Sequence, residues 1–252
     1  MIKDKPADDL IFGIRAVIEA IQAGKEIDKV LIKKGLTGDL FKELFDLIRI
    51  NNVPFQYVPI EKLNRISRKN HQGVLAFVMP IALQRIEDII PTLYEEGKIP
   101  FVLILDQVTD VRNFGAIVRS AECAGINAII IPDKSSARIN ADAVKTSAGA
   151  LHIVPVCRHR SLKEAVTFLK NSGLKLVAAT EKAINIYTNS NLLGPIAIVM
   201  GSEDTGIDPR LLALADEQVK IPLLGKIESL NVSVAAGLLA YEVVRQRSQT
   251  KE

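Results

Sequence analysis

The sequence predicts an α/β protein in which a small α/β unit precedes a larger domain built on a parallel sheet. Three observations predict this class. Nearly all-apolar segments recur through the C-terminal part of the chain, which is typical of strands buried on both faces. Stretches with the apolar spacing of helices separate several of these segments, as in a sheet covered by helices on both sides. The N-terminal third alternates shorter helical and strand patterns, which indicates a separate small unit.

Five patterns in the N-terminal third predict its elements in order. Apolar residues at helical spacing predict helices, and short apolar runs bounded by turn residues predict strands. The expected elements are a helix in 13–24, a strand in 28–35, a helix in 38–52, and strands in 53–59 and 73–80. We expect residues 1–80 to form one domain.

The remaining chain is expected to comprise a linker and a second domain. Residues 81–98 hold a short helical pattern and then a polar end, and we expect them to link the domains. The second domain, 99–252, begins with the apolar strand IPFVLILD. Further buried strands are expected at 127–133, 152–156, 174–180 and 195–201. A last helix is expected from Val232 to Val244, followed by a frayed tail, RQRSQTKE.

Length and composition are typical of a soluble globular protein. The chain has 252 residues, of which 48% are apolar and 24% are charged, enough for one large domain or two ordinary ones. No apolar run approaches the roughly 18 residues of a membrane helix, and the N-terminus lacks a signal-peptide pattern. We expect a cytoplasmic protein with no membrane partner. Cys123 and Cys157 belong to no CxxC or Cys/His cluster, so we expect no metal and two small buried hydrophobic residues.

The net charge of +3 argues against a protein that coats nucleic acid uniformly. Residues 1–79 contain 13 Lys and Arg against 10 Asp and Glu, whereas residues 80–252 carry 19 of each, so the surplus lies in the N-terminal third. Within it, EKLNRISRKNHQG gathers four cations beside one acid and could bind phosphates. A solvated helix end followed by a loop explains the same charges equally well.

In open α/β sheets ligands bind at the carboxyl ends of the strands, and three such ends are unusual here. The first is LDQVTDVRNFGAIVRSAECAG, in which a strand and a polar turn lead into a helix. Asn113 and Arg119 lie about 240° apart on an ideal helix, so they share a face only if Asn113 lies in the preceding turn. On this segment alone, a capping Asn113 and a surface Arg119 are the simpler interpretation.

The second strand end is IAIVMGSEDTGIDP. A P-loop requires Lys and Ser or Thr after the second glycine, and Ile207 and Asp208 follow Gly206 instead. The dinucleotide pattern GxGxxG fails as well. Glycines that permit close backbone approach, with Glu203 beside them, still suit a small polar ligand such as an adenosine or an amino-acid group.

The third strand end is KIESLNVSVAAG, which follows a strand and opens the last helix. Ser229 and Asn231 can each cap that helix, but a single cap requires only one residue. Small residues then allow the helix to approach another backbone closely. A site at the start of the helix explains these polar residues better than capping alone.

These three segments resemble the motifs of a known family. NFGAIVR, IVMGSEDTG and IPLLGKIESLNVSVAAG are similar, in order and spacing, to the three motifs of the SpoU class of RNA ribose 2'-O-methyltransferases in the SPOUT superfamily. IFGIRAVIEAI and HQGVLAFV resemble the L30e-like substrate-binding domain that precedes the catalytic domain in 23S rRNA guanosine 2'-O-methyltransferases. The segment VRNFG departs from the commoner Pro-His-Asn-Leu-Gly form.

The resemblance implies a fold and a cofactor that the residue patterns do not give. It implies a SPOUT catalytic domain with a C-terminal trefoil knot, a homodimer with a composite site, and S-adenosylmethionine held by the knot loops, largely through backbone groups. By motif matching, those loops fall near Gly201, Ile221 and Leu230, with the two aliphatic residues enclosing the adenine. Burial in the sheet core is the alternative for Ile221 and Leu230.

The resemblance also implies roles in catalysis and in RNA binding. Arg119 matches the arginine beside the reacting hydroxyl, acting as a base or as a cation; a guanidinium with a pKa above about 12 favours the cationic role. Asn113, Glu203, Ser229 and Asn231 match the remaining polar positions, and Glu228 would support the loop. Candidate RNA contacts in the N-terminal domain are Arg15, Arg65, Arg68, Lys69, His71 and Gln72. For His71 a structural role is slightly favoured.

Three alternatives stay open at this point. The acceptor could be a tRNA ribose rather than an rRNA ribose. The chain could be a catalytically silent RNA-binding or ribosome-assembly protein of the same fold, although such a protein would have no need of the polar residues in all three motifs. A dehydrogenase-type nucleotide-binding domain is disfavoured by the failed glycine patterns.

Overall fold

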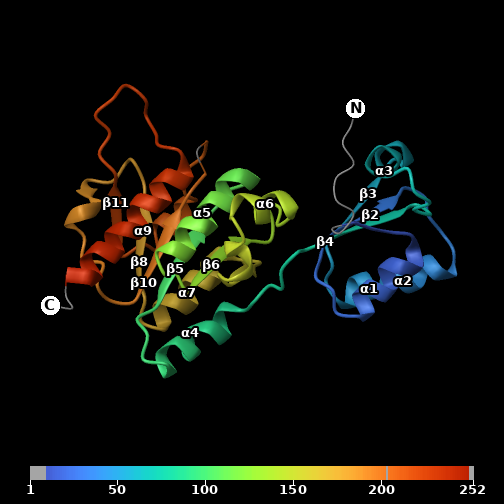
Figure 1. Cartoon of the computed structure of the whole chain (residues 1–252), viewed down its shortest axis with the longest axis horizontal. Coiled ribbons are helices and arrows are strands. Elements are labelled where there is room, and N and C mark those ends of the chain that lie inside the picture. Colours follow the sequence, from blue (N-terminus) through green and yellow to red (C-terminus); the bar gives the residue numbers. More distant parts are fainter. Residues whose placement is uncertain (1–9, 203, 250–252) are drawn as a thin grey trace. The chain divides into compact units, whose positions relative to one another are not determined.

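The computed structural model describes residues 10–202 and 204–249 and divides the chain into two compact units (Figure 1). The N-terminal unit runs to Ala82 and includes the short segment Ile139–Ala141. The C-terminal unit comprises Leu83–Arg138 and the residues from Asp142 on. Each unit has its own sheet and its own core, and each is described by itself.

The N-terminal unit is built on a four-stranded mixed sheet with the order β1-β4-β2-β3. Its strands are β1 (Leu10–Phe12), β2 (Ile27–Lys33), β3 (Phe55–Val58) and β4 (Val74–Val78). β4 pairs antiparallel with β1 and β2, whereas β2 and β3 are parallel. β3 therefore lies at one edge of the sheet.

Helices cover both faces of this small sheet. The helices are α1 (Ile14–Gln22), α2 (Asp39–Ile50) and α3 (Ile60–Ile66). α1 and α2 pack against each other and against the sheet, where Val30, Ile32 and Val74 are buried with them. α3 packs on the other face through Leu63, which is buried with Leu31 and Leu75. The sequence patterns did not predict α3 as a separate helix.

Most of the segment expected to be a linker forms a helix of the C-terminal unit. α4 (Ile86–Glu95) lies within residues 81–98. Its apolar residues Ile86, Ile90 and Leu93 are buried in the core of that unit, so they hold the helix in place. The helical pattern in the sequence was correct, but its polar end obscured the buried face.

The C-terminal unit contains a seven-stranded sheet with the order β7-β6-β5-β10-β8-β11-β9, and every pair in it is parallel. The strands are β5 (Phe101–Leu105), β6 (Ala128–Pro132), β7 (Val156–His159), β8 (Lys175–Ala179), β9 (Asn185–Ile186), β10 (Ile196–Met200) and β11 (Glu217–Lys220). β5, β6 and β7 are neighbours in chain order on one side of the sheet, and β10 pairs with β5 on its other side. The sheet thus confirms the predicted α/β class with a buried parallel sheet.

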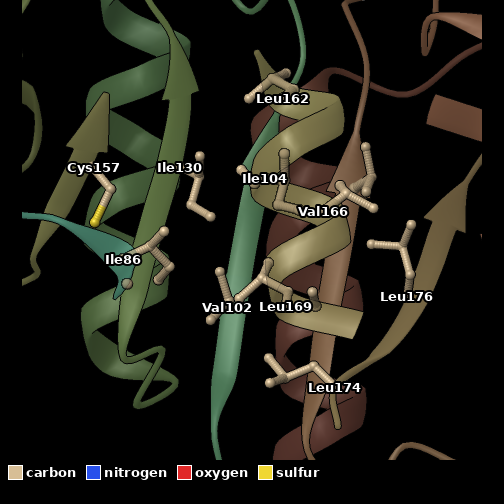
Figure 2. Packing of buried hydrophobic residues seen from close by; sticks show 14 of the residues in the cluster. Ile86, Val102, Ile104, Ile130, Cys157, Leu162, Val166, Leu169, Leu174 and Leu176 are labelled. Carbon is tan, nitrogen blue, oxygen red and sulfur yellow. The ribbon is translucent and has the colours of Figure 1, made fainter. Parts of the chain in front are cut away.

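Helices cover both faces of the parallel sheet. Besides α4, they are α5 (Val111–Cys123), α6 (Ala141–Thr146), α7 (Leu162–Asn171), α8 (Pro209–Leu212) and α9 (Val232–Gln249). Figure 2 shows α7 with Leu162, Val166 and Leu169 packed over the strands, where they join α4 and α8 in one core. α5 and α9 pack together on the opposite face. On that face the guanidinium of Arg247 from α9 lies 5.5 Å from the ring centre of Phe101 in β5. Phe101 and Val102 are consecutive strand residues, so their side chains point to opposite faces of the sheet.

Three local expectations were wrong. The strand expected at 152–156 begins only at Val156, because Gly149 adopts a left-handed φ of 89° and starts a 3-10 helix at Ala150–His152. The first five residues of the tail expected to be frayed continue α9 to Gln249, since Arg247 donates hydrogen bonds to carbonyl groups that include that of Gly194 at 2.8 Å, and residues 250–252 lie outside the described residues. Cys157 is buried, as expected, and burial raises the pKa of its thiol to about 12, whereas Cys123 is exposed.

No helix among the described residues combines the length and the hydropathy that crossing a membrane requires. The trefoil knot remains a prediction.

Candidate functional site

The carboxyl ends of β5 and β10 meet at one edge of the parallel sheet. The two strands pair in register from Phe101 with Ile196 to Leu105 with Met200. Beyond them, the backbone N–H of Asp106 donates to the carbonyl of Met200 at 2.8 Å. The first two polar segments therefore leave the sheet side by side, at the point where ligands collect in open α/β folds.

Asp110, rather than Asn113, caps the helix of the first segment. Its carboxylate accepts hydrogen bonds from the backbone N–H groups of Arg112, at 2.9 Å, and Asn113, at 2.8 Å. An aspartate just before a helical pattern is a known N-cap signal, so the sequence contained this information. Asn113 is therefore not the N-cap of α5.

A hydrogen bond between two asparagines joins the first segment to the third. The amide nitrogen of Asn231 donates to the side-chain oxygen of Asn113 at 2.9 Å, across 118 residues of sequence. The side-chain oxygen of Asn231 also accepts a bond from the backbone N–H of Ser233 at 3.0 Å, so it caps α9. Ser229 is exposed and is not the cap. One side chain thus begins α9 and fixes it against α5.

Arg119 does not share a face with Asn113. α5 begins at Val111, so both residues lie within the helix and keep the 240° separation of an ideal helix. Arg119 is exposed, and it has no ion pair or hydrogen bond within residues 10–202 and 204–249. Its charge is therefore available for an external anion.

The loop after β10 folds tightly over Gly201. A Cβ atom placed on Gly201 would lie 2.1 Å from the carbonyl carbon of Gly206 and 2.4 Å from the nitrogen of Ile207. The hydroxyl of Ser202 accepts a bond from the N–H of Thr205 at 3.1 Å and helps to close the turn. The expected close approach at Gly201 is thus a contact within the loop itself. Glu203, the acid expected beside it, lies outside the described residues.

The buried carboxylate of Asp106 holds this loop, a role that the sequence analysis missed. Asp106 is 4% exposed, and its side chain accepts a bond from the backbone N–H of Asp208 at 2.7 Å. Burial raises the pKa of the Asp106 carboxyl, although the bond from Asp208 opposes the rise. A bond from Arg210 lowers the pKa of Asp208. An aspartate directly after an all-apolar strand was the available signal.

The segment between β11 and α9 exposes apolar side chains and unpaired backbone. Figure 1 shows it as a long loop without helix or strand. Leu230 is 37% exposed and Ile221 is half-buried, so neither belongs to the sheet core. Among the described residues, no backbone group of residues 221–230 bonds to another backbone group. Aliphatic side chains beside free backbone donors and acceptors fit an adenine ring, which needs both apolar contact and hydrogen bonds.

Within the residues that the structure describes, no group of His, Cys, Asp and Glu is placed to hold a metal ion.

Comparison with known proteins explains this arrangement. The family described as "SpoU rRNA Methylase family" matches residues 100–241, which contain all three polar segments. This chain belongs to the SpoU rRNA methylase family. As a SpoU methylase it is an RNA methyltransferase, and its methyl donor is S-adenosylmethionine. A second family, described as "RNA 2'-O ribose methyltransferase substrate binding", matches residues 10–83.

Relatives of this SpoU methylase match it over nearly their whole length. YacO of Bacillus subtilis, described as a TrmH-family tRNA/rRNA methyltransferase, is 32% identical over 97% of this chain and 98% of its own. A Staphylococcus aureus protein with the same family description is 34% identical over 97% of this chain and 99% of its own. The crystal structure of an RNA 2'-O ribose methyltransferase is 28% identical, covers 95% of this chain and 88% of its own, and has a TM-score of 0.56.

The fold is shared with more distant SpoU methyltransferases. AviRb of Streptomyces viridochromogenes, solved in complex with AdoMet, is 24% identical and has a TM-score of 0.61 over 95% of this chain and 90% of its own. At this identity the likeness concerns the fold alone.

The candidate RNA contacts of this SpoU methylase differ in their surroundings. Arg15, Arg65, Arg68 and Lys69 are exposed. His71 is buried, and its ring bonds to the side chain of Asn64 at 2.9 Å and to the N–H of Gly73 at 3.0 Å. The side chain of Gln72 accepts a bond from the N–H of Ile14 at 3.3 Å, at the start of α1. His71 and Gln72 thus have structural partners, whereas the four cations face solvent.

Proposed function

We propose that this protein transfers the methyl group of S-adenosylmethionine to a ribose 2'-hydroxyl in RNA, at a guanosine of 23S rRNA. The hydrogen bond between Asn113 and Asn231 carries the proposal, because it brings two of the three motif segments together at the edge of the sheet where Gly201 follows β10. The proposal includes the cytoplasm as the place of action and the trefoil knot as the way in which the loops are held.

Methyl transfer requires the protein to hold the cofactor, to orient the ribose and to stabilise the charge that develops on the ribose oxygen. S-adenosylmethionine, when bound, supplies an electrophilic methyl group, and the protein has to place the ribose oxygen in line with it. The loop 221–230 would hold the cofactor through its backbone groups and through Ile221 and Leu230. Asn113 and Asn231 would orient the ribose. The developing negative charge on the oxygen then requires a cation, and no covalent protein intermediate is needed.

Arg119 is the residue proposed to supply that cation. It is exposed and unpaired within the described part of the chain, so its guanidinium can contact the ribose oxygen and the adjoining phosphate. Because it does not share a face with Asn113, we infer that it acts in the site of a second copy of the chain. Such a composite site makes activity depend on a homodimer.

The α5–α9 surface supports dimer formation. Val234, Leu238 and Tyr241 are 52%, 40% and 51% exposed and follow one another at helical spacing along α9. Together with Ala116 and Ser120 of α5 they line a shallow groove of about 600 Å³. An exposed apolar stripe of this kind is typical of a protein interface. Ser120 is next to Arg119, so a partner on this surface would lie beside the proposed cation.

Substitution of Leu238 tests the dimer. Leu238→Glu places a charge in the stripe, and we expect a monomer by sedimentation velocity with methyl transfer reduced by at least tenfold, since a buried unpaired charge is costly. Ile153→Glu is the matched control, because Ile153 is 68% exposed outside this groove. A wild-type monomer with full activity would contradict the composite site.

The acceptor is tested with purified RNA and with cells. The related proteins are described as tRNA/rRNA methyltransferases, which leaves both classes as candidates. Transfer of tritiated methyl groups from S-adenosylmethionine to purified 23S rRNA or to purified tRNA identifies the acceptor. Mapping that detects 2'-O-methylation on the labelled RNA then identifies the modified atom. Loss of one 2'-O-methylguanosine from 23S rRNA in a deletion strain is the expected result. Loss from tRNA alone would replace the acceptor, and absence of cofactor binding in calorimetry would favour a silent RNA-binding protein.

A further inference from the structure

Four aromatic rings form a continuous row on the N-terminal unit. Phe41 and Phe45 of α2 have ring centres 5.8 Å apart, Phe45 and Phe55 are 5.3 Å apart, and Phe55 and Tyr57 are 5.7 Å apart. The last two contacts are edge to face, which is a favourable geometry for aromatic pairs. The whole chain has only 8 Phe, 4 Tyr and no Trp, so this row holds a third of its aromatic residues.

The outer end of the row is open to solvent because β3 is an edge strand. Phe55 pairs with Val30 and Tyr57 pairs with Ile32, and both partners are buried with α1 and α2. Phe55 and Tyr57 therefore stand on the sheet face that these helices cover. The helices leave the edge uncovered, since Phe55 is 40% exposed and Tyr57 is 42% exposed. Two large aromatic side chains are thus held in fixed positions with part of their surface accessible.

The row ends where basic residues gather. Tyr57 precedes Val58, whose carbonyl accepts a hydrogen bond from the backbone N–H of Lys34 at 3.0 Å. The neighbouring N–H of Lys33 bonds to Gly73 at 2.8 Å, just before β4. Both lysines are exposed. The exposed cations Arg15, Arg68 and Lys69 lie in the segments at the same end of the sheet, where β1 ends and β4 begins.

We propose that Phe55 and Tyr57 form a stacking surface for an unpaired base of the RNA substrate. The phosphates next to that base would contact the basic end of the sheet. Exposed aromatic faces beside a positive surface are the features by which proteins bind single-stranded segments of RNA. The inference rests on the proposed function, because it takes RNA as the substrate. An RNA base is favoured over a protein partner because cations adjoin the rings and because the unit matches a substrate-binding family.

The direct test uses two RNA hairpins and the full-length protein. One hairpin carries 2-aminopurine in a flexible eight-nucleotide loop, and the other has the same stem closed by a compact four-nucleotide loop whose bases stack on one another. We expect the first to bind at least tenfold more tightly, with 2-aminopurine fluorescence quenched on binding. Tyr57→Ala should weaken binding of the first hairpin about tenfold, which corresponds to about 1.4 kcal/mol, and should abolish the quenching.

Matched variants separate stacking from folding and from charge. Tyr57→Phe keeps the ring and should bind like the wild type, whereas Tyr57→Leu keeps apolar volume but loses the π face and should behave like Tyr57→Ala. Tyr57 variants should lower affinity equally at all salt concentrations. Lys34→Ala should instead reduce the slope of log K against log salt by about 1, as expected for one lost phosphate contact. Unchanged melting temperatures exclude a folding defect.

The outcomes distinguish this inference from the proposed function. If the wild type methylates RNA but Tyr57→Ala binds both hairpins normally, the stacking surface is wrong and the enzyme assignment stands. If Tyr57→Leu binds and quenches like the wild type, the surface is a general apolar contact and the inference fails. If Tyr57→Ala loses only concentration-dependent self-association, the row is an interface between copies of the chain. If the wild type transfers no methyl group to any RNA, the proposed function fails first.

Discussion

Replacing Gly201 by alanine is expected to damage the loop after β10 and, through it, cofactor binding. The added methyl carbon would lie 2.1 Å from the carbonyl carbon of Gly206 and 2.3 Å from its oxygen, whereas ordinary contacts are 3.4–4 Å. The atoms that it meets are backbone, so no side chain can rotate away. The Gly206–Ile207 backbone would have to move by roughly 1 Å or more.

That movement has a calculable consequence, because the displaced backbone leads directly to Asp208. The bond from the N–H of Asp208 to the buried carboxylate of Asp106, at 2.7 Å, would be stretched or lost. Overpacking costs about 1–3 kcal/mol and a lost hydrogen bond to a charged group about 1.5–3 kcal/mol. Since the two effects overlap, we expect Gly201→Ala to lower the free energy of unfolding of the C-terminal unit by about 2–4 kcal/mol. Its melting temperature should fall by roughly 4–16 °C.

The assay combines thermal unfolding by circular dichroism with calorimetric titration of S-adenosylmethionine. Gly194→Ala is the matched control, because a Cβ atom there meets nothing within 4 Å. We expect the control to melt and bind like the wild type, and Gly201→Ala to melt earlier and bind the cofactor more weakly. If Gly201→Ala melted within 1 °C of the control with unchanged affinity, the packing argument would be refuted.

Three further predictions concern α5 and α9. Arg119→Ala should reduce methyl transfer by about 10²–10³-fold and leave S-adenosylmethionine affinity unchanged, as titration would show; near wild-type turnover would disprove its role. In a double-mutant cycle, Asn113→Ala and Asn231→Ala should show a coupling of about 0.5–1.5 kcal/mol in urea unfolding, and additive effects would contradict their bond. Hydrogen bonds from Arg245 lower the pKa of the buried Glu242 in the folded protein. The ionised Glu242 therefore stabilises the fold above about pH 4.3, the pKa of a glutamate in the unfolded chain. This stabilisation is lost as the pH falls through the lower pKa of Glu242 in the folded protein. Melting curves between pH 6 and pH 3 should therefore fall more steeply for the wild type than for Glu242→Gln, and parallel curves would count against this.

The sheet strands and the long amphipathic helices could be predicted from the sequence because their physical signals are local. An all-apolar run such as residues 101–105 has few stable alternatives to a buried strand. The strand order could not be predicted, since the placement of β10 between β5 and β8 depends on contacts between segments far apart in the sequence. The helical pattern of α4 was recognised, but its packing into the core of the C-terminal unit was not, for a related reason. Its buried face, Ile86, Ile90 and Leu93, becomes evident only beside the core that it joins.

The residues of the candidate site could likewise be predicted from the sequence only where their signals are local. Asn231 was identified as a possible cap and as a site residue. In the structure its side-chain oxygen caps α9, and its side-chain nitrogen donates a hydrogen bond to Asn113. The capping role of Asp110 had a local signal that was overlooked. For Asp106 the only local signal was its place directly after an all-apolar strand, because its function depends on the amide of Asp208, 102 residues away. Burial and distant pairing are properties of the fold that no local window of sequence contains.

The polar residues before α9 show what the fold requires and what it does not. Asn231 alone caps the helix and fixes it against α5. Glu228 and Ser229 are exposed and bond to no other residue that the structure describes, so the fold gives no reason for their polarity. Leu230, between them and the cap, leaves more than a third of its surface to solvent, although burial would stabilise it. A segment that exposes an aliphatic side chain and carries polar groups without structural partners has the features of a surface that contacts a ligand, and it is continuous with the asparagine that holds the two motif helices together.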